Sequence, residues 1–246
     1  MIALGTIVNC AAIIGGSTLG LFLRGGLPER LRTSLMQAVG LAVLFIGISG
    51  ALQGLLKQGA GAVLERGSIM VMILSLVAGA LAGELIDIDG RLVRLGNFLE
   101  QRFAKDGGDF TKGFVSSSLI YCIGAMAILG SFDDGLKGDT TVLFAKAVLD
   151  GVTAVVFAAS LGIGVLFSAI IVAAYQGALT LLALQLQSVL SEEVILQMSL
   201  VGSVLLAGIG ISLLEIKAIK VSNLLPAVAV PPIYQGLCDM VSALWR

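Results

Sequence analysis

The feature that most constrains this chain is a succession of long apolar runs separated by short polar breaks. A helix needs about 20 apolar residues to cross a bilayer. Eight segments of roughly that length can be delimited, at 2–23, 34–55, 68–86, 113–131, 141–160, 161–184, 194–214 and 224–245. The stretch 141–184 also fits one span followed by a re-entrant piece. The sequence therefore predicts an all-α polytopic transmembrane helical bundle of about eight segments, in a single integral membrane domain over residues 1–246.

The composition supports the same class and excludes others. Hydrophobic residues make up 57% of the chain and charged residues only 13%, whereas soluble domains carry about 25% charged residues. A net charge of −1 gives no reason to expect a nucleic-acid partner. The chain has no His, and Cys10, Cys122 and Cys238 are too far apart in sequence for a metal-ligand pattern. We therefore expect the lipid bilayer as surroundings, and neither a metal nor a cofactor.

The basic residues predict how the segments are oriented. If the first segment begins outside, ten Lys and Arg residues lie on the inner side and four on the outer side. The inner group is Arg24, Arg30, Arg32, Arg91, Arg94, Arg102, Lys105, Lys112, Lys217 and Lys220; the outer group is Lys57, Arg66, Lys137 and Arg246. Cytoplasmic loops carry an excess of Lys and Arg, so we predict both termini outside.

Residues 90–112 are expected to lie along the membrane rather than across it. Apolar residues recur at helical spacing from 92 to 103, and arginines interleave with them. This pattern is typical of an amphipathic helix in the membrane interface. A soluble helix docked on the bundle is the alternative.

Short sequence matches suggest an internal duplication. Residues 12–14 recur at 169–171, and residues 46–49 recur at 209–212. The matching segments would cross in opposite directions, so we expect two inverted repeats, a common plan of secondary transporters. The repeats would cover 1–89 and 161–246, on either side of the interfacial helix and of segments 113–160. Chance similarity between apolar sequences is the alternative.

Lys146 and Asp150 are the most informative polar residues, because they lie inside the apolar run 141–160. Four residues apart, they share one side of a helix. A charge at that depth is costly unless it is paired, hydrated or part of a pathway. One interpretation is a locked ion pair that only ties helices together. The other is a pair that opens to a solute or a proton.

Other residues are candidates by their position within apolar segments. The polar side chains of Asn9, Tyr175 and Gln176 would lie at depth, as interhelical hydrogen-bond partners or as ligands. The last segment is interrupted by Pro226 and by Pro231 and Pro232, and the break at Pro231 and Pro232 is a candidate because a broken helix can mark a binding site. Close helix packing through small residues predicts a homodimer, with interface candidates Gly16, Gly20, Gly79 and Gly83.

Four stretches carry a resemblance to a known family. They are GTIVNCAAIIGGSTLG near the start, GELIDIDGRL at 83–92, GFVSSSLIYCIGAMAILGS at 113–131 and KAVLDG at 146–151. Together they resemble the YqgA-like bacterial inner-membrane family, a domain-of-unknown-function family. The resemblance implies a multi-pass protein of the bacterial cytoplasmic membrane and a suspected transporter role. It implies no substrate and no catalytic residues.

Three classes of function remain open. The buried charge pair favours a secondary transporter or channel for a small ion or polar solute, with the Lys–Asp pair at the pathway. A structural or partner subunit of a membrane complex is the alternative. An intramembrane enzyme is less favoured, because the chain has no His, no paired-carboxylate motif and no nucleophile signature. We therefore expect no enzymatic activity.

Overall fold

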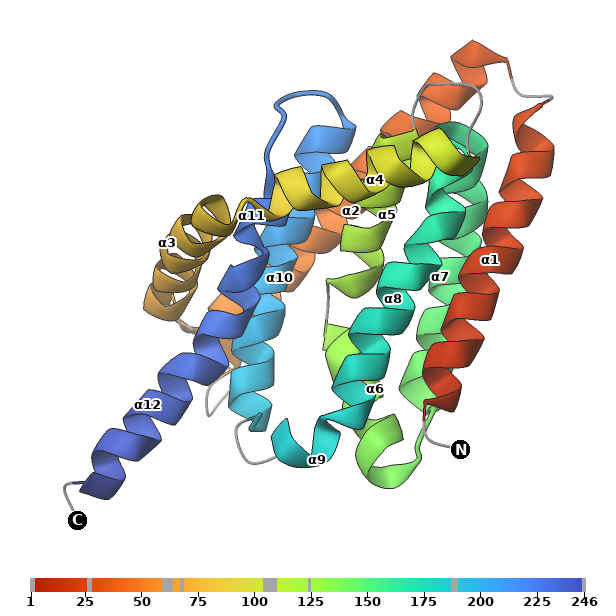
Figure 1. The fold of residues 1–246 in the computed structure, drawn as a ribbon. Coiled ribbons are helices and arrows are strands. Elements are labelled where there is room, and N and C mark those ends of the chain that lie inside the picture. The colour runs from red at the N-terminus through yellow and green to blue at the C-terminus, as the bar shows by residue number, and fades with distance from the viewer. Residues whose placement is uncertain are drawn as a thin grey trace.

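Several long helices of this protein run from one end of the molecule to the other and lie side by side (Figure 1). The computed structural model describes residues 3–25, 28–58, 64–66, 69–103, 110–123, 125–186 and 190–244. The elements are α1 (Leu4–Arg24), α2 (Glu29–Leu55), β1 (Leu56–Gln58), β2 (Leu64–Arg66), α3 (Ile69–Ile86), α4 (Ile88–Phe103), α5 (Phe110–Cys122), α6 (Ala125–Lys137), α7 (Thr141–Leu161), α8 (Gly164–Leu181), α9 (Ala183–Leu186), α10 (Glu192–Leu213), α11 (Val221–Leu224), the 3-10 helix η1 (Leu225–Ala229) and α12 (Val230–Leu244). The two short strands pair antiparallel between α2 and α3.

The all-α polytopic bundle is confirmed. Within the described residues, six helices are long and apolar enough to cross a membrane, namely α1, α2, α3, α7, α8 and α10. The pair α5–α6 would make a seventh span. The stretch α11–η1–α12 stands where the eighth segment was predicted. Residues 141–184 form two separate long helices, because Gly162, at φ 88°, ends α7 before α8 begins.

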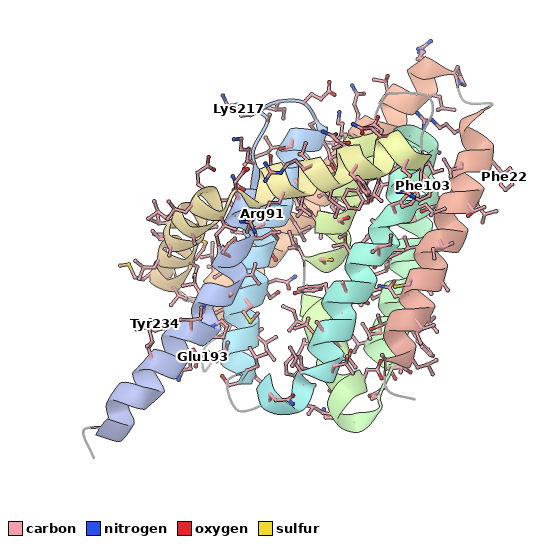
Figure 2. The ribbon with its side chains drawn as sticks, in the orientation of Figure 1. Phe22, Arg91, Phe103, Glu193, Lys217 and Tyr234 are labelled. Atoms are coloured by element: carbon pink, nitrogen blue, oxygen red, sulfur yellow. The ribbon has the colours of Figure 1, made fainter. Side chains whose placement is uncertain are left out.

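The two ends of the bundle differ. The start of α1 and the end of α12 lie toward one end, whereas α4 lies across the other (Figure 1). Arg91 and Lys217 lie near the α4 end, and Glu193 lies nearer the opposite end (Figure 2). This arrangement agrees with the start of α1 and the end of α12 on one side of the membrane and α4 on the other. That the α4 end is cytoplasmic stays a prediction from the loop charges.

A left-handed residue turns the chain from α3 into α4. Asp87 has φ 54°, a conformation that Asp tolerates better than most residues, and it ends α3. Its Oδ1 accepts a hydrogen bond of 3.1 Å from the backbone N of Gly90, in the first turn of α4. Leu95 and Phe98 on α4 are exposed. Exposed apolar side chains on a helix that crosses the end of the bundle favour the interfacial alternative.

The predicted segment 113–131 is not one straight helix. It is divided between α5 and α6, which meet at an angle of 60°. The acidic stretch 132–140, which lies between two predicted segments, is helical as far as Lys137. The last turn of α6 carries an i,i+4 ion pair between Asp133 and Lys137, with nitrogen and oxygen 2.7 Å apart. Two half-helices of 13 residues therefore replace one predicted span.

The last segment is also broken, at the predicted Pro226 but not at Pro231 and Pro232. The irregular part is η1, and Pro231 and Pro232 lie in the first turn of α12 instead of interrupting it. Proline is tolerated there because the first turn of a helix contains amides that have no partner within the helix. The expectation of a break at these prolines is therefore corrected to residues 225–229.

The glycines predicted to face a second copy are used within one chain. A Cβ on Gly16 would lie 2.1 Å from the carbonyl oxygen of Gly151 on α7, and one on Gly20 would lie 2.2 Å from that of Val155. Gly79 and Gly83 approach Ala227 and Asn223 on η1 and α11 in the same way. Small residues thus allow close helix packing, as predicted, but between helices of one protein. Dimerisation itself stays a prediction without an assigned face.

Three helix pairs pack antiparallel. Asn9 on α1 bonds to Gln176 on α8. Gly40 and Gly54 on α2 approach Leu214 and Leu200 on α10, so the residue numbers run in opposite directions. The third pair is α3 with α11–η1, through the contacts of Gly79 and Gly83. These pairs join the three helices α1, α2 and α3 to helices of the stretch 161–246, and the inverted repeat itself stays a prediction.

Candidate functional site

The candidate site lies where α1, α7 and α8 meet. The glycine contacts bring α1 and α7 to backbone distance, and α8 packs against both helices. Asn9 on α1, Asp150 on α7 and Gln176 on α8 are all buried. The tight α1–α7 packing leaves little room for an intervening layer of apolar side chains. The polar side chain of Asn9 therefore contacts those of Asp150 and Gln176 directly.

Lys146 and Asp150 form a buried ion pair. The Lys146 ammonium donates a hydrogen bond to Asp150 Oδ2. Their side chains are only 7% and 11% exposed. The ammonium also lies 6.0 Å from the centre of the Tyr121 ring on α5, close enough for a cation–π interaction. The predicted pairing of these two residues is thus present in the structure.

Asn9 links the ion pair to α8. Its Nδ2 donates to Asp150 Oδ2 at 3.0 Å and to Gln176 Oε1 at 3.2 Å. Because a carboxylate can only accept, the amide of Asn9 must turn its NH2 group toward Asp150. Gln176 must then present its oxygen to that same NH2 group. The charge on Asp150 thus fixes the orientation of both amides.

Two buried amide atoms remain without a partner. Asn9 Oδ1 and Gln176 Nε2 form no hydrogen bond within the described residues. Both side chains are 0% exposed. Leaving a buried donor or acceptor unsatisfied costs about 1–3 kcal/mol each. One spare acceptor and one spare donor beside an ion pair can hold a water molecule, an ion or a polar group of a solute.

An apolar cavity of about 260 Å³ lies at the break between α5 and α6. Its wall includes Cys122 and Ile128 on either side of the break and Leu225 and Val228 from η1. Tyr175 lines this cavity, whereas its neighbour Gln176 bonds to Asn9. Tyr175 and Gln176, although adjacent in sequence, therefore contribute to different sites: Tyr175 to the apolar cavity and Gln176 to the hydrogen bonds around Asp150. The broken helices meet at the cavity, and Pro231 and Pro232 follow η1 by less than one turn.

Sequence reasoning missed two residues of this region. Tyr121 is fully buried and places its ring beside Lys146. Asp134 lies outside the predicted segments, yet it is 1% exposed and accepts a 3.0 Å hydrogen bond from the backbone N of Gly5. Helical spacing from the apolar residues of 125–132 would have placed Asp134 on a helix. Within the described residues, no group of three His, Cys, Asp or Glu side chains is placed to hold a metal ion.

The fold and this polar centre define the class: a polytopic helical membrane protein with a charged pair buried in its bundle. The chain belongs to the family described as "Protein of unknown function (DUF554)", which matches residues 4–235. The resemblance noted in the sequence is thereby confirmed.

Two curated relatives support the same assignment. The chain is 33% identical over 229 residues to "Uncharacterized membrane protein YdfK" of Bacillus subtilis (strain 168), covering 93% of this chain and 94% of the relative. It is 31% identical over 229 residues to "Uncharacterized protein YqgA" of Escherichia coli (strain K12), covering 91% and 92%. No solved structure matches the chain significantly.

Proposed function

We propose that this protein is a secondary transporter or channel for a small ion or polar solute, located in the bacterial cytoplasmic membrane, with Lys146 and Asp150 at its pathway. The observation that carries the proposal is the incomplete hydrogen bonding around the pair. A purely structural ion pair is expected to satisfy its buried neighbours, because each unsatisfied group is destabilising. Here Asn9 Oδ1 and Gln176 Nε2 stay free beside the charges.

The ion pair suits a site that alternates between empty and occupied states. With no solute present, Lys146 and Asp150 neutralise each other, so the buried site carries no net charge. An anion or a carboxylate can compete for Lys146, and a cation or a proton can compete for Asp150. The neighbouring Asn9 and Gln176 offer an acceptor and a donor for the polar part of the solute.

The helix arrangement supports an alternating-access mechanism. Transporters built from inverted repeats bind substrate near the bilayer midplane, beside discontinuous helices. The three antiparallel helix pairs are those expected from an inverted repeat of 1–89 and 161–246. The α5–α6 break and η1 supply irregular backbone beside a cavity, where it is tolerated within a membrane.

Charge movement across proteoliposomes tests the proposal. The protein is reconstituted on a solid-supported membrane and challenged with concentration jumps of NaCl, KCl, protons and a panel of zwitterionic amino acids. We expect protein-dependent currents for at least one probe, and their loss in Asp150→Asn and Lys146→Met. Asp133→Asn, which changes a carboxylate paired near the end of α6, is the matched control and should retain them. Currents that are absent with every probe, or unchanged in both pair variants, would refute the proposal.

A further inference from the structure

A second group of buried polar side chains lies between α1, α6 and α8, apart from the Lys146–Asp150 pair. Its members are Thr6, Ser131, Asp134 and Thr180, and each is at most 5% exposed. Each has an oxygen without a hydrogen-bond partner in the described structure: Thr6 Oγ1, Ser131 Oγ, Asp134 Oδ1 and Thr180 Oγ1. We refer to these four residues as the outer cluster.

Backbone contacts bring the outer cluster together. Asp134 Oδ2 accepts a hydrogen bond from Gly5, the residue before Thr6. Gly135, the residue after Asp134, lies so close to α8 that a Cβ there would be 2.3 Å from the carbonyl oxygen of Thr180. Ser131 lies three residues before Asp134, one turn away on the same side of α6. All three helices thus contribute to one place.

The outer cluster gathers three unpaired hydroxyls around a carboxylate oxygen that is also unpaired, whereas the unpaired hydroxyls of Ser17, Ser75 and Ser118 lie on three different helices. Ser and Thr in a helix commonly bond to a carbonyl of the preceding turn. Ser117, Thr153 and Ser168 do so, with oxygen–oxygen distances of 2.6, 2.9 and 2.6 Å. Ser131 and Thr180 also lie within helices but leave their hydroxyls unpaired. These hydroxyls therefore remain available to an external partner.

Asp134 has one structural role that leaves half of its carboxylate unused. Ala3 gives no side-chain cap to α1, so the Asp134 Oδ2 bond to Gly5 supplies an acceptor at that helix N-terminus. The helix dipole also favours a negative charge there. Asp134 Oδ1 is not needed for this cap and is the oxygen left without a partner.

The outer cluster continues toward the central site. Thr6 lies three residues before Asn9 on α1, and Thr180 lies four residues after Gln176 on α8. At 1.5 Å per residue, the two steps are roughly 4.5 and 6 Å in the same direction along two antiparallel helices. That direction leads to the end of the bundle where α1 begins (Figure 1). A polar path thus runs from the ion pair past Asn9 and Gln176 to the outer cluster.

We propose that Thr6, Ser131, Asp134 and Thr180 form a binding site for a monovalent cation, Na⁺ or a proton, at the outer end of this path. One carboxylate and three hydroxyls provide hard oxygen ligands with a single formal negative charge. Hard cations prefer such oxygens, and one negative charge matches one positive charge. A role of this cation as the coupling ion rests on the proposed transport function. Binding of the cation to the outer cluster does not depend on transport.

Other ionisable groups lie on the elements packed around α6 and bear on any proton binding. They are Lys146 and Asp150 on α7, Tyr175 on α8, Cys10 on α1 with Arg24 at its far end, Glu192 and Glu193 at the start of α10, and Asp133 and Lys137 on α6 itself. Lys146 and Asp150 neutralise each other, as do Asp133 and Lys137. Asp134 therefore supplies the unneutralised carboxylate within the outer cluster.

Thermal unfolding of the purified full-length protein in detergent tests cation binding without any transport. Tm is measured in NaCl, KCl and choline chloride at equal ionic strength, and across pH. If Na⁺ is the ligand, the wild-type Tm should rise by about 3–5 °C for each tenfold increase in Na⁺ above Kd. Asp134→Asn should abolish this rise, because it removes the charge but keeps an oxygen for Gly5. Asp133→Asn, the control, should retain it.

If the ligand is a proton, Na⁺ should leave Tm unchanged. The wild-type Tm should then vary with pH over a range in which Asp134→Asn does not vary. Thr180→Val provides a second variant that leaves the α1 cap intact, and it should weaken the Na⁺ or pH response. Thr18→Val, at an exposed position on α1, should not. Identical Na⁺ and pH responses in wild type, Asp134→Asn and Thr180→Val would overturn the proposal, leaving Asp134 as a helix cap only. Loss of transport currents would not affect this result.

Discussion

A double-mutant cycle on Lys146 and Asp150 measures how strongly the buried pair is coupled. Lys146→Met leaves Asp150 Oδ2 with the Asn9 amide as its remaining hydrogen-bond donor, and Asp150→Asn leaves an ammonium without its carboxylate. Removing one partner of a buried pair costs about 3–5 kcal/mol, because the other charge remains buried and uncompensated. The double variant removes both charges, so it should be more stable than either single variant. A coupling free energy of about 2–4 kcal/mol is expected from the cycle.

The assay is reversible unfolding of the purified protein in mixed micelles, titrated with denaturing detergent. The matched control is a second i,i+4 Lys–Asp pair, Asp133 and Lys137, which lies at the end of α6. The Lys137 side chain is 69% exposed, and surface pairs of this kind contribute little. The same cycle on that pair should give no measurable coupling. Equal coupling at both pairs, or none at Lys146–Asp150, would refute the reasoning from burial.

Transport by the double variant then separates the two interpretations of the pair. If the pair only ties helices together, Lys146→Met combined with Asp150→Asn should recover both stability and the currents of the wild type. If the pair takes part in the pathway, the double variant should be folded and inactive. The second outcome is the one expected from the proposed function, because the polar atoms beside the pair are unsatisfied.

Three further predictions concern packing, topology and pH. Gly16→Ala should destabilise the protein by about 1–3 kcal/mol, because its Cβ would overlap the α7 backbone, whereas Gly15→Ala, with nothing within 4 Å, should unfold like wild type. In intact cells, a membrane-impermeant thiol reagent should label a cysteine at Asp139 and not one at Glu215; the reverse would show that the loop charges were misinterpreted. The ammonium of Lys112 holds the pKa of Glu215 below its ordinary value, so the small stability difference between wild type and Lys112→Met should be present at neutral pH and vanish as pH falls through that lowered pKa. A difference that persists in strong acid, measured by thermal unfolding, would contradict this assignment.

The membrane class and six of the eight predicted segments could be predicted from the sequence, because the length of an apolar run is a local property that the bilayer thickness sets. The Lys146–Asp150 pair could also be predicted, because two residues four positions apart on one helix are neighbours whatever surrounds the helix. The spacing of Gly16 and Gly20 also predicted close helix packing, but it did not predict that α7 is the helix packed against them. Nothing local distinguishes a face that meets α7 from one that meets a second chain.

The composition of the candidate site was decided by tertiary structure alone. Asn9 and Gln176 are 167 residues apart, and only the packing of α1 against α7 and α8 joins them to Asp150. Asp134 carried a loop-like signal, because it lies in an acidic, glycine-containing stretch. Its burial depends on the start of α1, which lacks a cap of its own and takes an acceptor from α6. Contacts between distant segments depend on which helices pack together, and a linear pattern of apolar and polar residues does not specify that choice.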